Sequence, residues 1–189
     1  GVEAINPAGV VVGGEQYDLD CLIYASGFEV GTDYHRRAGF DMEGRGSRRL
    51  SEHWSDGMLS LHGMHVHGFP NAFIVGPTQA ANLISNIPHN FVEAGATIGA
   101  IVAHAEAIGA AEVEVDPEAE AAWVERLEAG GRSFGGDPSC TPGYYNNEGR
   151  ERDRRGLRNS VGYPEGPVAY FDYIAEWRTN GSFDGLTFR

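Results

Sequence analysis

The chain has 189 residues, a formal net charge of −13 at pH 7 and a hydrophobic fraction of 41%, as in soluble globular proteins. This length suits one or two domains with a substantial buried core, and no uninterrupted run approaches the roughly 18 apolar residues of a membrane span. The negative charge argues against a nucleic-acid partner or an anionic membrane surface, and the absence of a visible signal peptide together with only two cysteines, Cys21 and Cys140, favours a cytoplasmic protein.

The first 25 residues predict short strands. Two apolar runs within residues 1–14 flank Asn6-Pro7-Ala8-Gly9, which predicts a hairpin because Pro and Gly supply the backbone angles of a turn. Gly13-Gly14 predicts a second turn. Residues 20–25 form an apolar run that ends at Ser26-Gly27, and we expect a buried strand there. Because the first residue is glycine and the chain opens within this β-meander, we expect the sequence to be part of a longer protein.

Residues 32–61 are polar and rich in Gly and Arg, with a short helix predicted near residues 50–55. The stretch that follows, LHGMHVHG, carries His62, His65 and His67, which together with His53 form a candidate metal site. No cysteine lies nearby, however, and the spacing matches no zinc motif. We therefore interpret these histidines as structural or solvent-facing.

Residues 68–91, GFPNAFIVGPTQAANLISNIPHNF, have three parts. Residues 73–76 are a short apolar run between breakers, which predicts a strand buried on both faces, as in a parallel sheet. Residues 78–85 are a loop of polar and small side chains. Ser85-Asn86 supplies helix caps and Pro88 suits the first turn of a helix that runs to about Gly109. A strand, a loop and a helix N-terminus in this order direct backbone N–H groups toward an electron-rich ligand.

The remaining sequence predicts two more helices. Residues 113–115 form a short strand or an extended link, and Asp116-Pro117 begins a helix that ends at Gly130-Gly131. The apolar stripe of this helix consists of Trp123, Val124 and Leu127. Residues 132–162 are irregular, as in a functional loop or a disordered segment. A final amphipathic helix covers residues 164–180, with an apolar face formed by Val168, Phe171, Ile174, Ala175 and Trp177.

The segment HGFPNAFIVGPTQAANLISNIPHNF resembles the closing segment of the flavin domain in Baeyer–Villiger monooxygenases, which depend on FAD and NADPH. Three further segments agree in order. DLDCLIYASGF resembles a strand and turn of that family, with Ser26 where the family has threonine. SCTPGYYNNEG and YPEGPVAYFDYIAEWRTNGSFDGL resemble the C-terminal region of its larger ring-ketone and steroid types. The resemblance covers nearly the whole chain, but only the last third of such an enzyme.

The resemblance implies an α/β fold, the C-terminal part of a flavoprotein with two dinucleotide-binding domains. This part is a partial FAD-binding Rossmann-like domain plus a region of helices and loops. Residues 1–28 then end the nicotinamide-binding domain, residues 29–110 close the FAD-binding domain, and residues 111–189 are a C-terminal extension.

The resemblance also assigns site residues, with FAD and NADP as cofactors and a small-molecule ketone as substrate. It implies insertion of one oxygen atom from O2 into the ketone to give an ester or lactone. It assigns no catalytic residue and no metal site within this chain. The cofactor-binding residues are Gly76, Gln79, Ser85, Asn86 and Ile87. The substrate-binding residues are Asn82, Leu83, Ile84, Tyr144 and Tyr145.

The sequence lacks the G-x-G-x-x-G fingerprint of a complete dinucleotide-binding fold. We therefore expect the chain to bind FAD weakly or not at all by itself, and to require the missing N-terminal FAD/NADP domains or a partner chain. The alternative is a non-enzymatic α/β binding or interaction module derived from the same fold.

Overall fold

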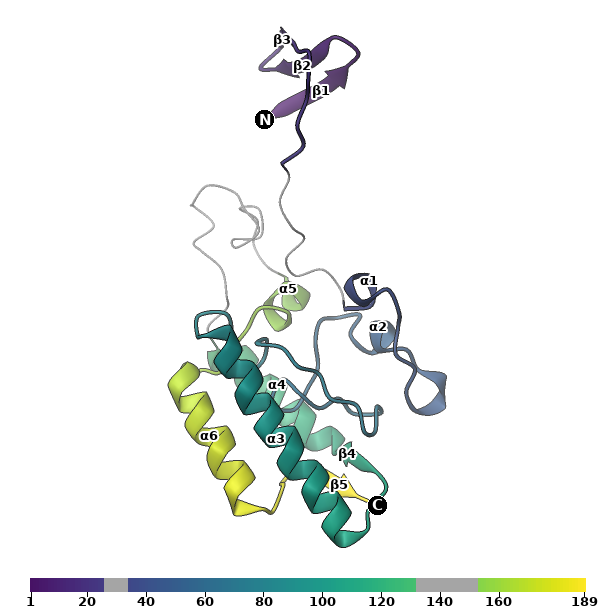
Figure 1. The fold of residues 1–189 in the computed structure, drawn as a ribbon, viewed down its shortest axis with the longest axis vertical. Helices are drawn as coiled ribbons and strands as arrows, with labels where there is room; N and C mark the ends of the chain where they lie inside the picture. The colour runs from purple at the N-terminus through teal and green to yellow at the C-terminus, as the bar shows by residue number, and fades with distance from the viewer. Residues whose placement is uncertain (26–33, 132–152) are drawn as a thin grey trace.

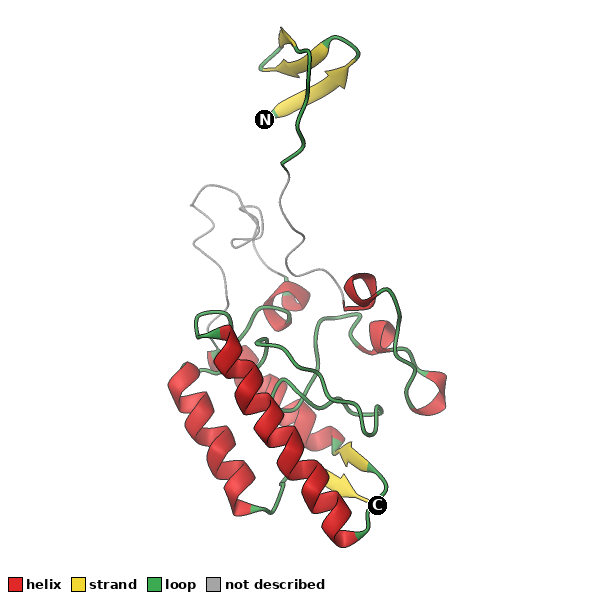
Figure 2. Ribbon diagram, viewed as in Figure 1, coloured by secondary structure: helices red, strands yellow, loops and turns green. Residues whose placement is uncertain are grey.

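The computed structural model describes residues 1–25, 34–131 and 153–189. Three antiparallel strands come first, and helices with two further short strands follow (Figure 1, Figure 2). The helices pack around a long irregular segment, residues 54–86, which passes through the interior. The expected α/β class is confirmed, but the parallel sheet is not seen among the described residues, where both sheets are antiparallel.

The N-terminal residues form the predicted meander of β1 (Val2–Asn6), β2 (Gly9–Val12) and β3 (Glu15–Asp18). The Asn6 side chain shapes the first turn, since its Oδ1 accepts hydrogen bonds from the N–H groups of Ala8 and Gly9, both at 3.0 Å. Gly13 and Gly14 form the second turn with φ of 60° and 78°, as two-residue hairpin turns require. The meander stands apart from the other described elements (Figure 1).

The buried strand expected at residues 20–25 is wrong. These residues are extended but exposed, and Ile23 and Tyr24 keep 82% and 73% of their surface accessible. A strand needs a neighbour for its backbone N–H and C=O groups, and no described segment pairs with residues 20–25. Ser26, Gly27 and Phe28 lie outside the described residues.

Three short helical segments follow: α1 (Tyr34–Ala38), the 3₁₀ turn η1 (Arg45–Ser47) and α2 (Leu50–His53). The helix predicted near residues 50–55 is confirmed by α2, and Trp54 anchors its end by donating from Nε1 to the Leu59 carbonyl at 2.9 Å. The predictions missed α1 because its five residues are too few to show an apolar period.

The strand expected at residues 73–76 is also wrong. Phe73 forms only an isolated antiparallel bridge with His65, and Val75 is 44% exposed, so the run is not buried on both faces. The Ile74 N–H donates to the Met64 carbonyl at 2.8 Å, which places the segment beside residues 61–66 rather than in a parallel sheet. The apolar run does not form a strand, because it pairs with only one other segment and only at an isolated bridge.

The long helix α3 (Ile87–Ile108) confirms the prediction for residues 87–109. The Asn86 Oδ1 caps it by accepting from the His89 N–H at 3.2 Å, and Gly109 ends it in the left-handed conformation at φ 73°. By length and composition α3 is apolar enough to cross a membrane, whereas the sequence predicted no membrane span. A single helix of this kind is weak evidence for a span, since core helices of soluble proteins pass the same test. Its inner face packs on α6 (Pro167–Asn180), where the Arg178 guanidinium contacts Thr97 and Glu93.

The C-terminal half adds β4 (Val113–Val115), α4 (Pro117–Gly130), α5 (Arg154–Arg158) and β5 (Leu186–Phe188). The predictions found β4 and α4 but missed β5, which pairs with β4 in antiparallel register. They also missed α5, because its sequence is polar and rich in arginine. In α6 the apolar face differs from prediction, since Val168 is 71% exposed while Tyr170 is buried.

One hydrophobic core joins elements from both sides of residue 110, so residues 34–131 and 153–189 pack together. The assignment of the ranges 1–28, 29–110 and 111–189 to domains of a larger enzyme stays a prediction. The core includes Trp123 and Leu127 of the predicted α4 stripe and the inner faces of α3 and α6. Its larger members are Leu61, Met64, Ile101, Trp123, Leu127, Tyr163, Tyr170, Ile174 and Trp177.

Truncation of Leu127 tests this core, because its side chain is fully buried on α4. We expect Leu127→Ala to lower the free energy of unfolding by about 2–5 kcal/mol, through lost apolar transfer and the cavity left behind. Glu125→Ala, an exposed change on the same helix, serves as the control and should stay within about 0.5 kcal/mol. Urea denaturation followed by tryptophan fluorescence measures both, and equal losses would contradict the packing described.

Candidate functional site

The irregular segment ends in a loop, residues 76–87, that leads into the N-terminus of α3. We call this segment the 76–87 loop. Gln79 and Asn82 adopt left-handed backbone conformations, with φ of 57° and 64°, which non-glycine residues rarely do. These conformations place the side chains of Gln79 and Asn82 in the interior, whereas Leu83 and Ile84 lie at the surface.

The Gln79 side chain is fully buried and uses all of its hydrogen-bonding groups. Its Oε1 accepts from the Ser60 Oγ at 2.6 Å, and its Nε2 donates to the carbonyls of Met58 at 2.7 Å and Arg158 at 3.2 Å. In this structure the Gln79 side chain holds the loop. The expectation that Gln79 binds the cofactor stays a prediction.

Asn82 also turns inward. Its Nδ2 donates to the Ser160 carbonyl at 2.9 Å, and its own backbone carbonyl accepts from the Ser85 Oγ at 2.9 Å. The Asn82 side chain is buried, so its expected contact with substrate is not supported by its position. Like Gln79, it joins the loop to the segment after α5.

The other predicted site residues lie together at the outer surface of the loop and the start of α3. Leu83 and Ile84 are 37% and 60% exposed and present an apolar surface. The Ser85 hydroxyl accepts from the Asn90 Nδ2 at 2.6 Å. The N–H groups of Asn86 and Ile87 have no hydrogen-bond partner within the described part of the chain.

Two features limit what the helix N-terminus offers a ligand. Pro88 has no N–H, and the Asn86 cap already occupies the His89 N–H, so two backbone donors remain. Gly76, at the start of the loop, has open space beside its Cα. Tyr144 and Tyr145, predicted to bind substrate, lie outside the described residues, as does Cys140.

Three contacts beneath the loop were not predicted from the sequence. The Gln79 N–H donates to the Val161 carbonyl, and the Tyr163 N–H donates to the Ala80 carbonyl, both at 2.9 Å. The Trp123 Nε1 donates to the Gln79 carbonyl at 3.1 Å. A buried indole N–H needs an acceptor, which is a usable signal for Trp123. Backbone pairing between two irregular segments leaves no trace in a side-chain pattern.

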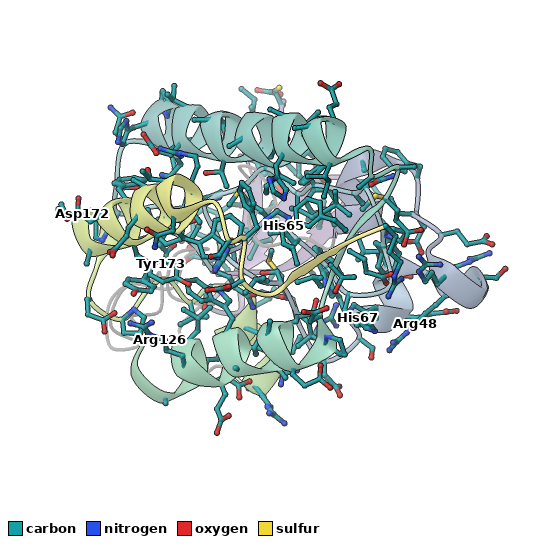
Figure 3. All side chains as sticks on the ribbon, turned by 90° about the horizontal axis from the view of Figure 1, so that it is seen from below. Arg48, His65, His67, Arg126, Asp172 and Tyr173 are labelled. Atoms are coloured by element: carbon teal, nitrogen blue, oxygen red, sulfur yellow. The ribbon has the colours of Figure 1, made fainter. Side chains whose placement is uncertain are left out.

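Of the candidate metal histidines, His53, His62 and His65 are buried and His67 is partly exposed. His62 and His65 are buried, and the His62 ring packs between Trp123 and Trp177, each with its ring centroid 4.8 Å away. Figure 3 shows His65 in the interior between α3 and α4. No group of three His, Cys, Asp or Glu side chains suited to a metal ion occurs among residues 1–25, 34–131 and 153–189.

Burial sets the ionisation of these two histidines. Desolvation lowers the pKa of His62 well below its usual value, with a smaller contribution from His65. Desolvation also lowers the pKa of His65 to about 4. Both rings are therefore neutral at pH 7. The His62 Nε2 pairs with the Tyr173 hydroxyl at 3.0 Å.

Beside this cluster, α4 and α6 enclose an open cleft of about 530 Å³, where Arg126 and Tyr173 lie (Figure 3). The Arg126 guanidinium is held by Glu165 at 3.0 Å and lies 4.6 Å from the centre of the Tyr163 ring. None of the predicted site residues that the structure describes lines this cleft. It is lined by Leu61, His62, Ala119, Ala122, Trp123, Arg126, Tyr173, Glu176, Trp177, Asn180, Asp184 and Gly185.

Comparisons with known proteins were made on sequence and on structure. No family model matches the chain. Pentalenolactone D synthase from Streptomyces exfoliatus is 41% identical over 194 residues, covering 100% of this chain and 32% of the relative. A Baeyer–Villiger monooxygenase from Streptomyces coelicolor is 40% identical over 180 residues (94% of this chain, 29% of the relative). The FAD-binding monooxygenase hmp7 from Hypomyces subiculosus is 35% identical over 187 residues (98% and 31%).

Solved structures agree with these relatives. Polycyclic ketone monooxygenase from the thermophilic fungus Thermothelomyces thermophila superposes with a TM-score of 0.78 at 30% identity, covering 100% of this chain and 31% of that one. An oxidized steroid monooxygenase bound to NADP gives 0.76 at 26% identity, covering 99% and 33%. The match is to the C-terminal part of these enzymes, and the chain spans about a third of the length of the relatives it matches.

The buried histidines predict a pH dependence of stability. Their pKa values are lower in the folded than in the unfolded chain, so the unfolded chain binds more protons below pH 6.5 and the free energy of unfolding falls as pH falls. Each histidine contributes up to about 1.4 kcal/mol per pH unit. We expect His65→Phe to reduce the slope between pH 6.5 and pH 5 by about half.

Urea denaturation at several pH values measures this slope. The window stops at pH 5 because ion pairs and hydrogen bonds lower the pKa values of Asp41, Glu128 and Glu165, which add their own loss of stability at lower pH. An unchanged slope in His65→Phe would show that the ring is not a buried neutral group.

Proposed function

We propose that this chain, whose homologues are Baeyer–Villiger monooxygenases that it matches in their C-terminal third, supplies the flavin-facing loop and the C-terminal region of such an enzyme. The observation that carries the proposal is the match of the whole chain to these enzymes in both sequence and fold. The complete enzyme inserts one oxygen atom from O2 into a small-molecule ketone to give an ester or lactone, with FAD and NADP as cofactors.

The 76–87 loop fits a flavin by its chemistry. Leu83 and Ile84 offer apolar surface to a flat aromatic ring system, and the two N–H groups of Asn86 and Ile87 offer donors to its carbonyl edge. The positive end of the α3 dipole favours negative charge at the same place. Bound FAD supplies the redox chemistry, while these residues bind it, orient it and exclude water.

Substrate contacts follow from the same surface. We propose that Leu83 and Ile84 also line the substrate side of the flavin, because both are apolar and lie next to the donors at the start of α3. Tyr144 and Tyr145 remain proposed substrate residues on the strength of the family resemblance alone. No side chain of this chain is assigned a catalytic role.

The rest of the cofactor site comes from outside this chain, from N-terminal FAD/NADP domains or a partner chain. The outer face of α3 supports this, because it is apolar and uncovered. Val92 is 64% exposed, and Gly95 and Gly99 on the same face have open space beside them. An apolar patch of this kind marks an interaction surface. Its exposed apolar side chains are Phe91, Val92 and Val102.

The protein is proposed to work in the cytoplasm without a membrane or a nucleic acid. A net charge of −13 disfavours both anionic partners, and an interface on the outer face of α3 accounts for the apolar character of that helix. The alternative of a non-enzymatic binding or interaction module is not favoured, because the relatives are monooxygenases and synthases.

Turnover tests the proposal. We expect the gene product that contains this chain to retain FAD after desalting and to oxidise NADPH when a polycyclic or steroid ketone is added. Under ¹⁸O₂ the ester or lactone formed should carry one labelled oxygen atom, detected by mass spectrometry. A gene product that holds flavin and oxidises NADPH but gives only hydroxylated product would contradict the proposed reaction.

A visible absorption spectrum of the 189-residue chain alone tests whether other domains or a partner chain complete the cofactor site. We expect no flavin absorbance to remain after FAD addition and desalting, because the sequence has no dinucleotide fingerprint. Stoichiometric FAD retention by this chain would contradict the proposal that other domains or a partner complete the site.

The α3 surface gives a further prediction. We expect the isolated chain to self-associate as its concentration rises, and Val92→Glu to suppress this by placing a charge in the apolar patch. Val168→Glu is the matched control, since Val168 is 71% exposed but lies on α6. Sedimentation velocity at several concentrations measures the association. A chain that stays monomeric throughout, or equal effects of both variants, would show that α3 is not an interface.

A further inference from the structure

We infer that Gln79 is a positioning residue whose buried amide sets where the apolar surface and backbone donors of the 76–87 loop stand. The inference rests on the proposed function, because the loop matters to a reaction only if it faces the flavin. The positioning itself is a property of this chain and can be tested without any turnover.

The Gln79 amide fits its surroundings in a way that other side chains do not reproduce. Its single oxygen faces a hydroxyl donor on Ser60, and its two N–H groups face the carbonyls of Met58 and Arg158. Glutamate would offer no donor to those two carbonyls, and methionine would leave all three groups unpaired. Ser60 is itself fully buried, so no water replaces the lost partner without rearrangement.

The backbone of the same residue is equally constrained. Its N–H and C=O are bonded to Val161 and Trp123, and its left-handed conformation, at φ 57°, is unfavourable in a residue with a side chain. The hydrogen bonds of the amide and backbone together hold this conformation. Gln79 thus joins three separate segments: residues 58–60, α4, and residues 158–161.

Gln79 is connected to the exposed residues Leu83 and Ile84 by a short segment, residues 80–82, that is tightly packed against residues 160–163. The Ala80 carbonyl is bonded to the Tyr163 N–H, and the Asn82 side chain to Ser160. The backbones approach so closely that a Cβ on Gly162 would lie 2.6 Å from the Asn82 Cβ. Leu83 and Ile84 follow directly. When the Gln79 amide is lost, the outer part of the loop gains freedom while the Asn86 cap of α3 remains.

Gln79→Met is the central variant, because it keeps the length of the side chain and removes its hydrogen bonds. Ser60→Ala removes only the donor to Oε1 and should give a weaker version of the same effect. Gln16→Met on the exposed strand β3 is the matched control for the substitution itself. All variants are made in the gene product that contains this chain.

Hydrogen exchange measures the positioning. In Gln79→Met we expect the hydrogen-bonded amides of residues 79–85, which include those of Gln79, Asn82 and Ser85, to exchange about tenfold faster, while β4 and the core of α4 exchange at the wild-type rate. Loss of one to two net hydrogen bonds corresponds to a factor of this size. Exchange that is unchanged in residues 79–85, or that increases equally throughout the protein, overturns the inference.

Steady-state kinetics with a polycyclic ketone measure the consequence. We expect the KM for the ketone to rise about tenfold in Gln79→Met, with kcat and the amount of bound FAD less affected. The KM of Ser60→Ala should lie between those of the wild type and of Gln79→Met. A variant with local loosening but with wild-type KM and kcat would overturn the role in the reaction. If the wild-type protein holds no flavin and gives no ester, the proposed function fails, while the exchange result still decides the positioning role.

Discussion

The fold depends on satisfying backbone hydrogen bonds in an irregular segment that passes through the core. Residues 54–86 contain no helix or strand, yet much of this stretch is buried. Buried N–H and C=O groups without partners are costly. Side chains of β4, of α4 and of the segment itself supply these partners. Glu120 accepts from the His67 N–H at 2.8 Å, Glu114 from the Gly68 N–H at 3.2 Å, and the Gln79 amide donates to two carbonyls.

This solution explains why polar residues in the interior serve structure while the surface of the loop remains free. Glu114 is buried because it also receives the Arg45 guanidinium at 2.8 Å, and Arg189 and Glu112 extend that network at the C-terminal strand. Each of these charges is paired, as buried charges must be. The loop is fixed from below by such contacts, so its apolar tip needs no packing partner of its own and can present Leu83 and Ile84 outward.

The sequence predicted well those features that depend on only a few neighbouring residues. The caps of α3, the Asn6 turn and the α4 stripe each depend on local spacing, and each is confirmed. The internal hydrogen bonds of the Gln79 and Asn82 side chains were not predicted, because polar side chains in a loop before a helix resemble ligand contacts in any sequence, and the ligand roles of both residues stay predictions. Only the three-dimensional path of residues 58–60 and 158–161 reveals that acceptors and donors for these amides already exist inside the protein. Tyr144 and Tyr145 stay predictions, since they lie outside the described residues.

The two strands that were expected and not found have a common physical cause. An apolar run becomes a strand only when neighbouring strands complete its hydrogen bonds and cover its faces. Residues 20–25 have no such neighbour among the described residues, and residues 73–76 have one bridge. The outer face of α3 is uncovered in the same way. Three separate apolar features are thus only partly paired or covered, while the internal core around Trp123 is complete. If other domains or a partner chain complete the fold, as proposed, they must cover all three features together, and residues 73–76 lie directly before the loop proposed to face the flavin. The same partner would then complete both the backbone pairing of residues 73–76 and the cofactor site.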